Sequence, residues 1–315
     1  MLDAGAGPHS TFRARRTSAA RMREVAGNSL FVAPSILLIL VIIVWPIIQG
    51  LVLSFQNVYL LIPRPVAFRG LDNYAALLAD PNFWPMISNT IIWAGLSVAI
   101  VVPLGLLLAV VLDINFPLRN LVRAICILPY AVPSVVVAAN WKWIFDTDGG
   151  ILNYLLVATG LITERIPWLA SEQLALYATV LPNVWRLLPF VTLVILAGLQ
   201  AVPQEIYDAA EVDGAGRWQT FRHIALPQVR YMLMICLVLS TIWSLMHLDI
   251  ILVMTQGGPV RASEVMSISI YRFAFSDFQF SLSAALSTLL FLIVLGLTAI
   301  YMSLLNEKPW EEAEV

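Results

Sequence analysis

Charged side chains are scarce in this sequence. They make up 12% of its 315 residues, whereas soluble domains carry about 25%. A net charge of −2 offers no basic face for a phosphate backbone, which excludes a nucleic-acid partner. Two cysteines are too few for a disulfide-stapled scaffold, and the glycines and prolines follow no collagen period. Because 60% of the residues are apolar, the class that remains is an integral membrane protein.

Lysine and histidine are also rare, which limits the chemistry open to the chain. Neither Lys142 nor Lys308 follows a glycine, so no Gly-Lys loop could cradle the phosphates of a nucleotide. His9, His223 and His247 lie far apart in the sequence, which gives no metal-ligand spacing. We therefore expect no catalytic residue, metal or cofactor on this chain, and ATP hydrolysis, if used, takes place on another.

Six apolar stretches are long enough to span a membrane, since about 20 apolar residues cross the roughly 30 Å hydrocarbon layer. We expect spans at about residues 30–55, 87–112, 121–145, 174–199, 229–254 and 282–305. The third is marginal, because its uncharged interval between Arg123 and Lys142 is only 18 residues long. The predicted fold class is an all-α integral membrane protein with six transmembrane helices.

The distribution of Lys and Arg between the loops predicts the orientation. An even number of spans puts both termini on one side, and the loops of that side carry more Lys and Arg than the others. By the positive-inside rule that side is cytoplasmic. We expect residues 1–29 to form a cytoplasmic N-terminal segment, because the apolar run after them is too long for a signal peptide. Residues 306–315 are expected to form a cytoplasmic tail.

The longest cytoplasmic loop, residues 201–228, has the pattern of two short helices joined by a turn. Pro203 suits the first turn of a helix, where its missing N–H costs nothing. Glu205 and Asp208 then lie near the positive end of the helix dipole. Residues Asp213–Gly216 predict the turn, because glycine reaches backbone angles that side chains forbid.

A second short helix after this turn would place Trp218 and Phe221 on one stripe with Ile224 or Ala225. Two interpretations of the pattern stay open at this point. The loop is either a hairpin that only links two spans, with Trp218 anchored in the headgroups, or a docking element that offers Trp and Phe to a partner's groove.

The same loop resembles the EAA loop of bacterial ABC importer permeases. The residues that carry the resemblance are Asp208-Ala209-Ala210-x-x-Asp213-Gly214-Ala215, followed by Phe221, Ile224 and Leu226-Pro227. The glycine, the second acid and the closing Leu-Pro stand at the family's spacing. Asp208 stands where the family usually has glutamate. This difference keeps the negative charge and shortens the side chain.

Further stretches resemble the sugar-importing branch of these permeases, related to the maltose and glycerol-3-phosphate systems. They are Leu128-Pro129 with Pro133, Trp141-Lys142-Trp143 with Gly150 and Asn153, Trp185-Arg186 with Pro189-Phe190, and Asp249 followed by Gly257-Gly258-Pro259. With these the resemblance extends from about residue 30 to residue 305. The chain lacks the extra N-terminal helices and the large periplasmic insert of the maltose permease, and so resembles the six-helix form.

The resemblance implies a type I ABC importer fold in a bacterial inner membrane. A periplasmic solute-binding protein, a second homologous permease subunit and two ATPase subunits are the implied partners, with ATP and Mg on the ATPases. Residues 201–228 would then be the cytoplasmic coupling hairpin. The implied coupling residues are Asp208, Ala209, Ala210, Asp213, Gly214, Ala215, Trp218 and Phe221. We hypothesise that Gly214 sets the hairpin angle and that the two acids cap helices or pair with ATPase cations.

Polar and aromatic residues within the spans are candidates for a solute pathway, because intramembrane polar groups usually face a cavity or a partner helix. The candidates are Asn89, Asn140, Trp141, Asn183, Trp185, Arg186, Trp243 and Asp249. For the aromatics, anchoring in the lipid interface or packing in the core is an open alternative. Arg186 indicates pathway lining or a functional ion pair, with Asp249 as its partner or, equally, as a helix-to-loop cap.

We hypothesise that the chain is a permease subunit that translocates a sugar or sugar-like solute. A polyol, a glycerol phosphodiester or a sulfonated sugar are the alternative solutes. An ion-coupled secondary transporter would need inverted repeats and mid-membrane carboxylates, of which Asp249 is the lone candidate. A membrane hydrolase built from Ser244, His247 and Asp249 is disfavoured, since three near-neighbours on one helix rarely converge.

Overall fold

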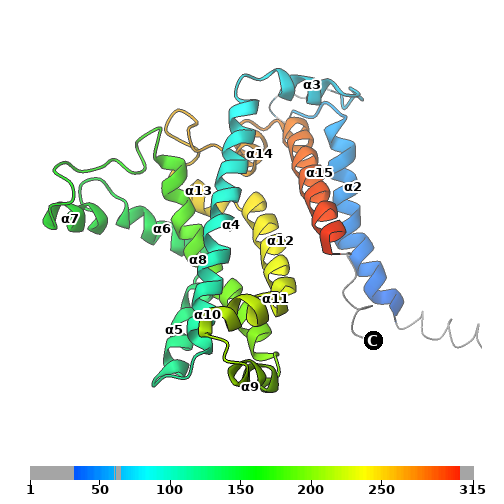
Figure 1. Cartoon of the computed structure of the whole chain (residues 1–315). Coiled ribbons are helices and arrows are strands. Elements are labelled where there is room, and N and C mark those ends of the chain that lie inside the picture. The colour runs from blue at the N-terminus through cyan, green and yellow to red at the C-terminus, as the bar shows by residue number, and fades with distance from the viewer. Residues whose placement is uncertain (1–31, 60, 62–64, 306–315) are drawn as a thin grey trace, which may run out of the picture. The chain divides into compact units, whose positions relative to one another are not determined.

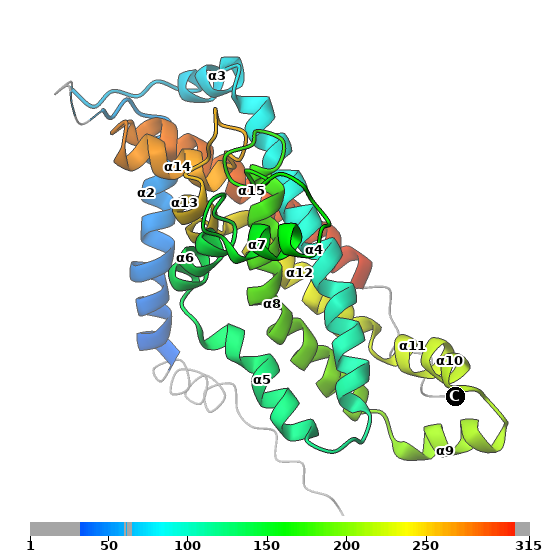
Figure 2. The same cartoon turned by 90° about the vertical axis from the view of Figure 1, so that its left-hand side faces the viewer.

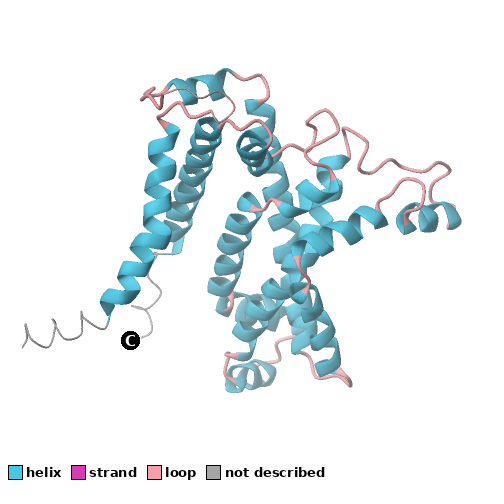
Figure 3. Ribbon diagram, turned by 180° about the vertical axis from the view of Figure 1, so that it is seen from behind, coloured by secondary structure: helices cyan, strands magenta, loops and turns pink. Residues whose placement is uncertain are grey.

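A computed structural model describes residues 32–59, 61 and 65–305. The N-terminal segment 1–29 and the tail 306–315 of the sequence prediction lie outside the described residues. Within those ranges the fold is helical, and the β pairing consists of one isolated bridge between Gln56 and Phe68 (Figure 3). The elements are η1 (Leu40–Val44), α2 (Trp45–Ser54), α3 (Asp72–Ala79), α4 (Phe83–Asp113), α5 (Arg119–Ala131), α6 (Ser134–Ile144), α7 (Ile151–Ala158), α8 (Ala175–Gln200), α9 (Gln204–Val212), α10 (Arg217–Thr220), η2 (Phe221–Ala225), α11 (Leu226–Gln228), α12 (Arg230–Met246), α13 (Asp249–Met254), α14 (Met266–Phe275) and α15 (Phe280–Leu305).

The chain divides into two compact units, residues 1–52 and residues 53–315. The described part of the first unit is an apolar helix, which runs from Val32 into α2 and has the composition of a membrane span. A π-helical turn, η1, interrupts its regular pitch, and no side chain of that turn is buried. This helix corresponds to the predicted first span at 30–55.

Four described helices are long and apolar enough to cross a membrane unaided, and two bent pairs raise the number to six if each pair is one span. The unaided spans are Val32–Ser54, Phe83–Asp113, Ala175–Gln200 and Phe280–Ser303. The predicted spans at 87–112, 174–199 and 282–305 therefore correspond to α4, α8 and α15. Of these, α4 begins four residues earlier than predicted.

The predicted third span, 121–145, is not one straight helix. It consists of α5 and α6, whose axes meet at 99°. Pro133 causes the break, because it lacks an N–H and forces the preceding residue out of the helical region. Val132 accordingly has an extended backbone, with φ −85° and ψ 128°.

The predicted fifth span, 229–254, is also divided. α12 ends at Met246, His247 is extended, and the short helix α13 begins at Asp249. The carbonyl of His247, freed by this break, accepts a hydrogen bond of 2.8 Å from Ser267 Oγ. Such a partner makes a broken helix tolerable inside a bundle.

The core of the second unit lies between α4 and α8, which run side by side (Figures 1 and 2). Gly105 permits their close approach, since a Cβ at this position would lie 2.4 Å from Val191 Cγ1. Trp93 is buried against the same interface and donates from Nε1 to Thr179 Oγ1 at 2.9 Å. α12 packs against both helices, so the three form the framework on which the loops are held.

The second unit has two distinct ends. α9, α10 and the start of α5 lie at one end, which we call the hairpin end, whereas α3 and α14 lie at the other, the opposite end (Figure 2). The candidate coupling residues therefore all lie at one end of the bundle, away from the loop after α13.

Candidate coupling hairpin and solute pathway

Residues 201–228 fold into helical segments on either side of a turn, as the sequence predicts. α9 begins directly after Pro203, and Glu205 lies in its first turn. The side chain of Gln204 donates to Asp208 Oδ1 at 3.0 Å. Ala210 is buried while Ala209 is exposed, so α9 contacts the rest of the chain through a narrow face.

The turn between the two segments is built around Gly214. Its φ is +77°, in the left-handed region that favours glycine. The N–H of Gly214 donates to Glu211 O at 3.0 Å, and the N–H of Ala215 donates to Ala210 O at 2.9 Å. This pair of bonds is the Schellman motif, with glycine at the position just past the helix end. The spacing Ala-x-x-Asp-Gly-Ala therefore specifies a helix stop and a fixed change of direction.

The second helical segment begins after Gly216, whose N–H donates to Gln219 Oε1 at 2.8 Å. α10, η2 and α11 follow one another without a loop, and together they meet α12 at a bend of 62°. Ala225 and Val229 are buried at this bend. The hairpin is thus continuous with a helix of the bundle core.

The two aromatic residues of this segment face different surroundings. Trp218 is 68% exposed, whereas Phe221 is half-buried and packs against the main core. Their ring centroids are 5.6 Å apart. The prediction that both share one stripe agrees with this contact, but of the two only Trp218 is exposed on the surface of the chain.

The acids of the motif are solvent-facing. Asp208 and Asp213 are exposed, and neither forms an ion pair with any described residue. Asp208 is held by Gln204, and Asp213 closes α9 through its backbone N–H to Ala209 O. Helix capping by the side chain of either acid is absent among the described contacts, which leaves both carboxylates available to a cation.

Within the bundle, two of the candidate pathway residues, Asn183 and Arg186, form a polar cluster with Ser244 between α8 and α12. Asn183 Nδ2 donates to Ser244 Oγ at 3.1 Å, and Arg186 Nη2 donates to Asn183 Oδ1 at 3.0 Å. The Nε of Arg186 and the Nε2 of His247 are buried without a hydrogen-bond partner. Buried polar atoms without partners are rare and call for an explanation.

The pairing of Arg186 with Asp249, one of the two predicted roles for that acid, is not seen. No ion pair within 4.0 Å joins them in the described chain, and Asp249 instead accepts a short hydrogen bond from Ser134 Oγ. Asp249 is the first residue of α13 and Ser134 the first of α6, so the bond ties two helix starts together. No side-chain cap is present at the start of α13 either, so the described contacts of Asp249 show neither of the two predicted roles.

The remaining candidates are dispersed. Trp141 and Trp185 form an edge contact with centroids 6.4 Å apart, and Trp243 packs edge-on against Phe190 at 4.7 Å. Asn140 is exposed on α6. Asn89 lies on α4, where its side chain donates to the carbonyls of Ala262 and Glu264 at 3.1 Å each. Asn89 therefore fastens a loop at the opposite end and does not join the cluster around Arg186.

Comparison with known proteins identifies the family to which this architecture belongs. The family described as "Binding-protein-dependent transport system inner membrane component" matches residues 101–306, which include the hairpin and the polar cluster. The chain belongs to this family. It is a membrane-spanning permease subunit of an ATP-binding-cassette importer.

Relatives of similar length support the assignment. The permease is 34% identical over 287 residues to the trehalose/maltose transport system permease protein MalF of Thermococcus litoralis, with 91% of this chain and 96% of the relative covered. It is 32% identical over 279 residues to the sulfoquinovosyl glycerol transport system permease protein SmoG of Agrobacterium fabrum, with 89% and 90% covered. A solved bacterial ABC transporter that imports the acidic polysaccharide alginate has a chain with TM-score 0.78 and 25% identity, covering 91% of the permease and 99% of that chain.

The permease also contains a buried ionic network that the sequence analysis did not single out. Glu264, 3% exposed, pairs with Arg272 at 2.6 Å and with Arg261 at 3.4 Å, and it accepts a short hydrogen bond from Ser269 Oγ. Asp80 faces both arginines, and its pKa is lowered chiefly by the backbone N–H of Asn82. In the sequence, the network is indicated by Glu264, which lies three residues after Arg261 and eight before Arg272, in a segment that has few other charges.

Proposed function

We propose that this permease carries a sugar or a sugar-like solute across the bacterial inner membrane, driven by separate ATPase subunits that hold the hairpin. The observation that carries the proposal is the Schellman-capped bend at Gly214, which presents Trp218 at the hairpin end. The printed names of the relatives support the solute class, since they concern trehalose or maltose, sulfoquinovosyl glycerol and alginate.

The continuity of the hairpin with α12 provides the mechanical route. A displacement of α10 is passed to α12 at the 62° bend without an intervening loop. α12 carries Ser244, which accepts the hydrogen bond from Asn183 on α8. Movement of the hairpin would therefore rearrange the polar cluster, as a rigid-body transition between two packed states does.

The polar cluster offers the chemistry that a polyhydroxylated solute requires. The unpartnered Nε of Arg186 and Nε2 of His247 supply hydrogen-bonding atoms, and the faces of Trp141 and Trp185 supply apolar surface for C–H groups. We propose that Asn183, Arg186 and these aromatics line the solute path. A polyol, a glycerol phosphodiester or a sulfonated sugar would meet the same groups, and Arg186 would suit the anionic ones.

We further propose an orientation of the permease in the membrane and a set of partner subunits. The hairpin end and both termini are cytoplasmic, and the opposite end faces a periplasmic solute-binding protein. A second homologous permease subunit completes the membrane-spanning pair, and two ATPase subunits carry ATP and Mg. A solved alginate transporter in complex with its periplasmic protein has a chain of the same fold.

Uptake should depend on the ATPase subunits. In proteoliposomes that contain the whole importer and its binding protein, inactivating the nucleotide site of the ATPase is expected to reduce uptake to the background. A proton ionophore should leave uptake unchanged in the presence of ATP. Uptake that persists without ATP and collapses with the ionophore would instead establish an ion-coupled secondary transporter.

A further inference from the structure

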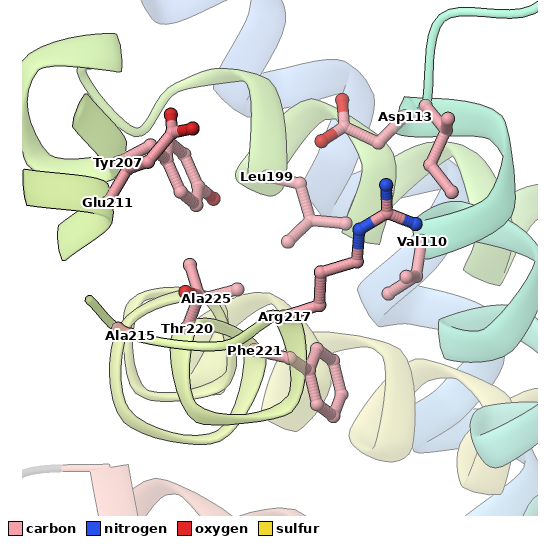
Figure 4. Close-up of a pocket in the computed structure, with 11 residues that line it drawn as sticks. Val110, Asp113, Leu199, Tyr207, Glu211, Ala215, Arg217, Thr220, Phe221 and Ala225 are labelled. Carbon is pink, nitrogen blue, oxygen red and sulfur yellow. The ribbon is translucent and has the colours of Figure 1, made fainter.

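A cavity of about 400 Å³ separates the hairpin from the end of α4 (Figure 4). Its apolar walls come from the core side of α4, α8 and η2, and include Val110, Leu199 and Phe221. Three charged residues line it: Asp113 is contributed by α4, Arg217 by α10 on the opposite side, and Glu211 by α9. Figure 4 shows the carboxylate and the guanidinium pointing toward each other across this space.

Both charges stand at the unfavourable end of their helix. Asp113 is the last residue of α4, where the helix dipole is negative, and Arg217 is the first residue of α10, where it is positive. Neither belongs to an ion pair within 4.0 Å among the residues that the structure describes. A direct contact between them would offset both unfavourable placements at once.

The neighbouring cations do not neutralise the carboxylate of Asp113. Arg119 donates to the backbone carbonyl of Asp113 at 3.3 Å and to Asn115 Oδ1 at 2.7 Å. Arg123 donates to the carbonyl of Leu112 at 2.8 Å. Both arginines therefore bind the backbone end of α4, and the side chain of Asp113 remains directed into the cavity.

The phenol of Tyr207 also lines the cavity, from the α9 side of the hairpin. Its pKa is raised by burial and, to a smaller extent, by the negative charge of Asp113. Tyr207 therefore stays protonated and can donate a hydrogen bond toward that carboxylate when the cavity narrows. Groups from both halves of the hairpin thus face the end of α4.

We propose that Asp113 and Arg217 form an ion pair in another state of the transport cycle, and that this contact draws the hairpin onto α4 and closes the cavity. The inference rests on the coupling role proposed for the hairpin. Asp113 and Arg217 are then positioning residues. Their contact transmits the movement of the hairpin to α4, in addition to the route through α12. Because α4 packs along α8, this second route also reaches the helix that carries Asn183 and Arg186.

Charge exchange between the two positions tests the contact. In the complete importer, Asp113→Arg and Arg217→Asp are each expected to lower ATP-driven uptake roughly fivefold, because each places like charges on opposite sides of the cavity. The double variant Asp113→Arg/Arg217→Asp is expected to recover most of that loss. The matched control is Asp113→Arg/Arg119→Asp, which restores the net charge at the end of α4 without restoring a pair across the cavity, and it should not recover uptake. An exchange variant as impaired as the single variants would overturn the proposal.

A readout independent of activity uses Asp113→Cys/Arg217→Cys in a background with Cys126 and Cys236 replaced. The yield of disulfide under a mild oxidant is expected to differ several-fold between the nucleotide-free and the nucleotide-trapped importer. An equal yield in both states would contradict a contact that depends on state. Replacing Gly214 by valine tests the coupling function separately. If Gly214→Val uncouples ATP hydrolysis from uptake but the exchange variant does not recover uptake, the ion pair alone is refuted and the coupling function stands.

Discussion

Replacing Gly214 by valine is expected to lower solute uptake by more than about tenfold, with the permease still inserted in the membrane and the ATPase still hydrolysing ATP. The φ of +77° costs an ordinary side chain roughly 1–2 kcal/mol, and a β-branched one more. A cost of about 1.4 kcal/mol lowers the population of the native turn relative to other conformers by a factor of ten. A Cβ at this position would meet no atom within 4 Å, so the effect is conformational and not a clash.

Two glycines outside the turn centre serve as controls for this variant. Gly160→Val imposes the same kind of strain, at φ +71° and in open surroundings, but lies in the segment after α7. It should lower stability without uncoupling. Gly216→Ala has φ −72° and should be tolerated, because its Cβ would lie 3.7 Å from Gln219 Oε1. Normal coupled uptake by Gly214→Val would refute the role of the turn, as would equal uncoupling by Gly160→Val.

Removing the carboxylate of Glu264 is expected to give the largest loss of stability. Glu264→Ala leaves Arg272 without its closest partner in a protein interior, and breaking a buried pair in this way costs roughly 3–5 kcal/mol. The lower value is expected, because Arg272 is 26% exposed and keeps its contact with Asp277 at 3.8 Å. In domains of 150–250 residues about 3 kcal/mol corresponds to a fall in Tm of roughly 6–12 °C, and the lower end is expected for this longer chain. Thermal unfolding of the purified importer in detergent measures it.

The matched control for Glu264 is an exposed ion pair elsewhere in the same chain. Asp148 is 92% exposed and lies 3.4 Å from Arg165. Exposed pairs contribute little, since solvent screens them and the long side chains lose entropy. Asp148→Ala should leave Tm unchanged, and a Glu264→Ala variant that behaves as mildly would contradict the importance assigned to the network.

The hairpin was predictable from sequence because its determinants are local. A glycine that must adopt a positive φ and acids near a helix start act within a few residues, and the structure places the turn at the predicted glycine. The burial of Phe221 was not predictable in the same way. Helical spacing shows that Phe221 and Trp218 share a stripe, but the neighbours of that stripe come from α4 and α8, far away in the sequence.

The breaks inside two of the predicted spans have a similar origin. Composition identifies an apolar stretch but does not detect a break inside it, although Pro133 marks the point between α5 and α6. The break before Asp249 carries no proline, and it is compensated by Ser267 from a distant segment. The network around Glu264 depends on Asn89, whose side chain donates a hydrogen bond to the backbone carbonyl of Glu264 from 175 residues away in the sequence. A single sequence does not reveal that contact.

The most direct test of the central claim asks what Trp218 touches in the working importer. A photo-crosslinking benzoyl-phenylalanine in place of Trp218 is expected to join the permease to the ATPase subunit in native membranes. The same group in place of Leu292, 54% exposed on α15, should join it to lipid. Crosslinks from position 218 to lipid alone, in an importer that still couples ATP hydrolysis to uptake, would contradict the role of the hairpin.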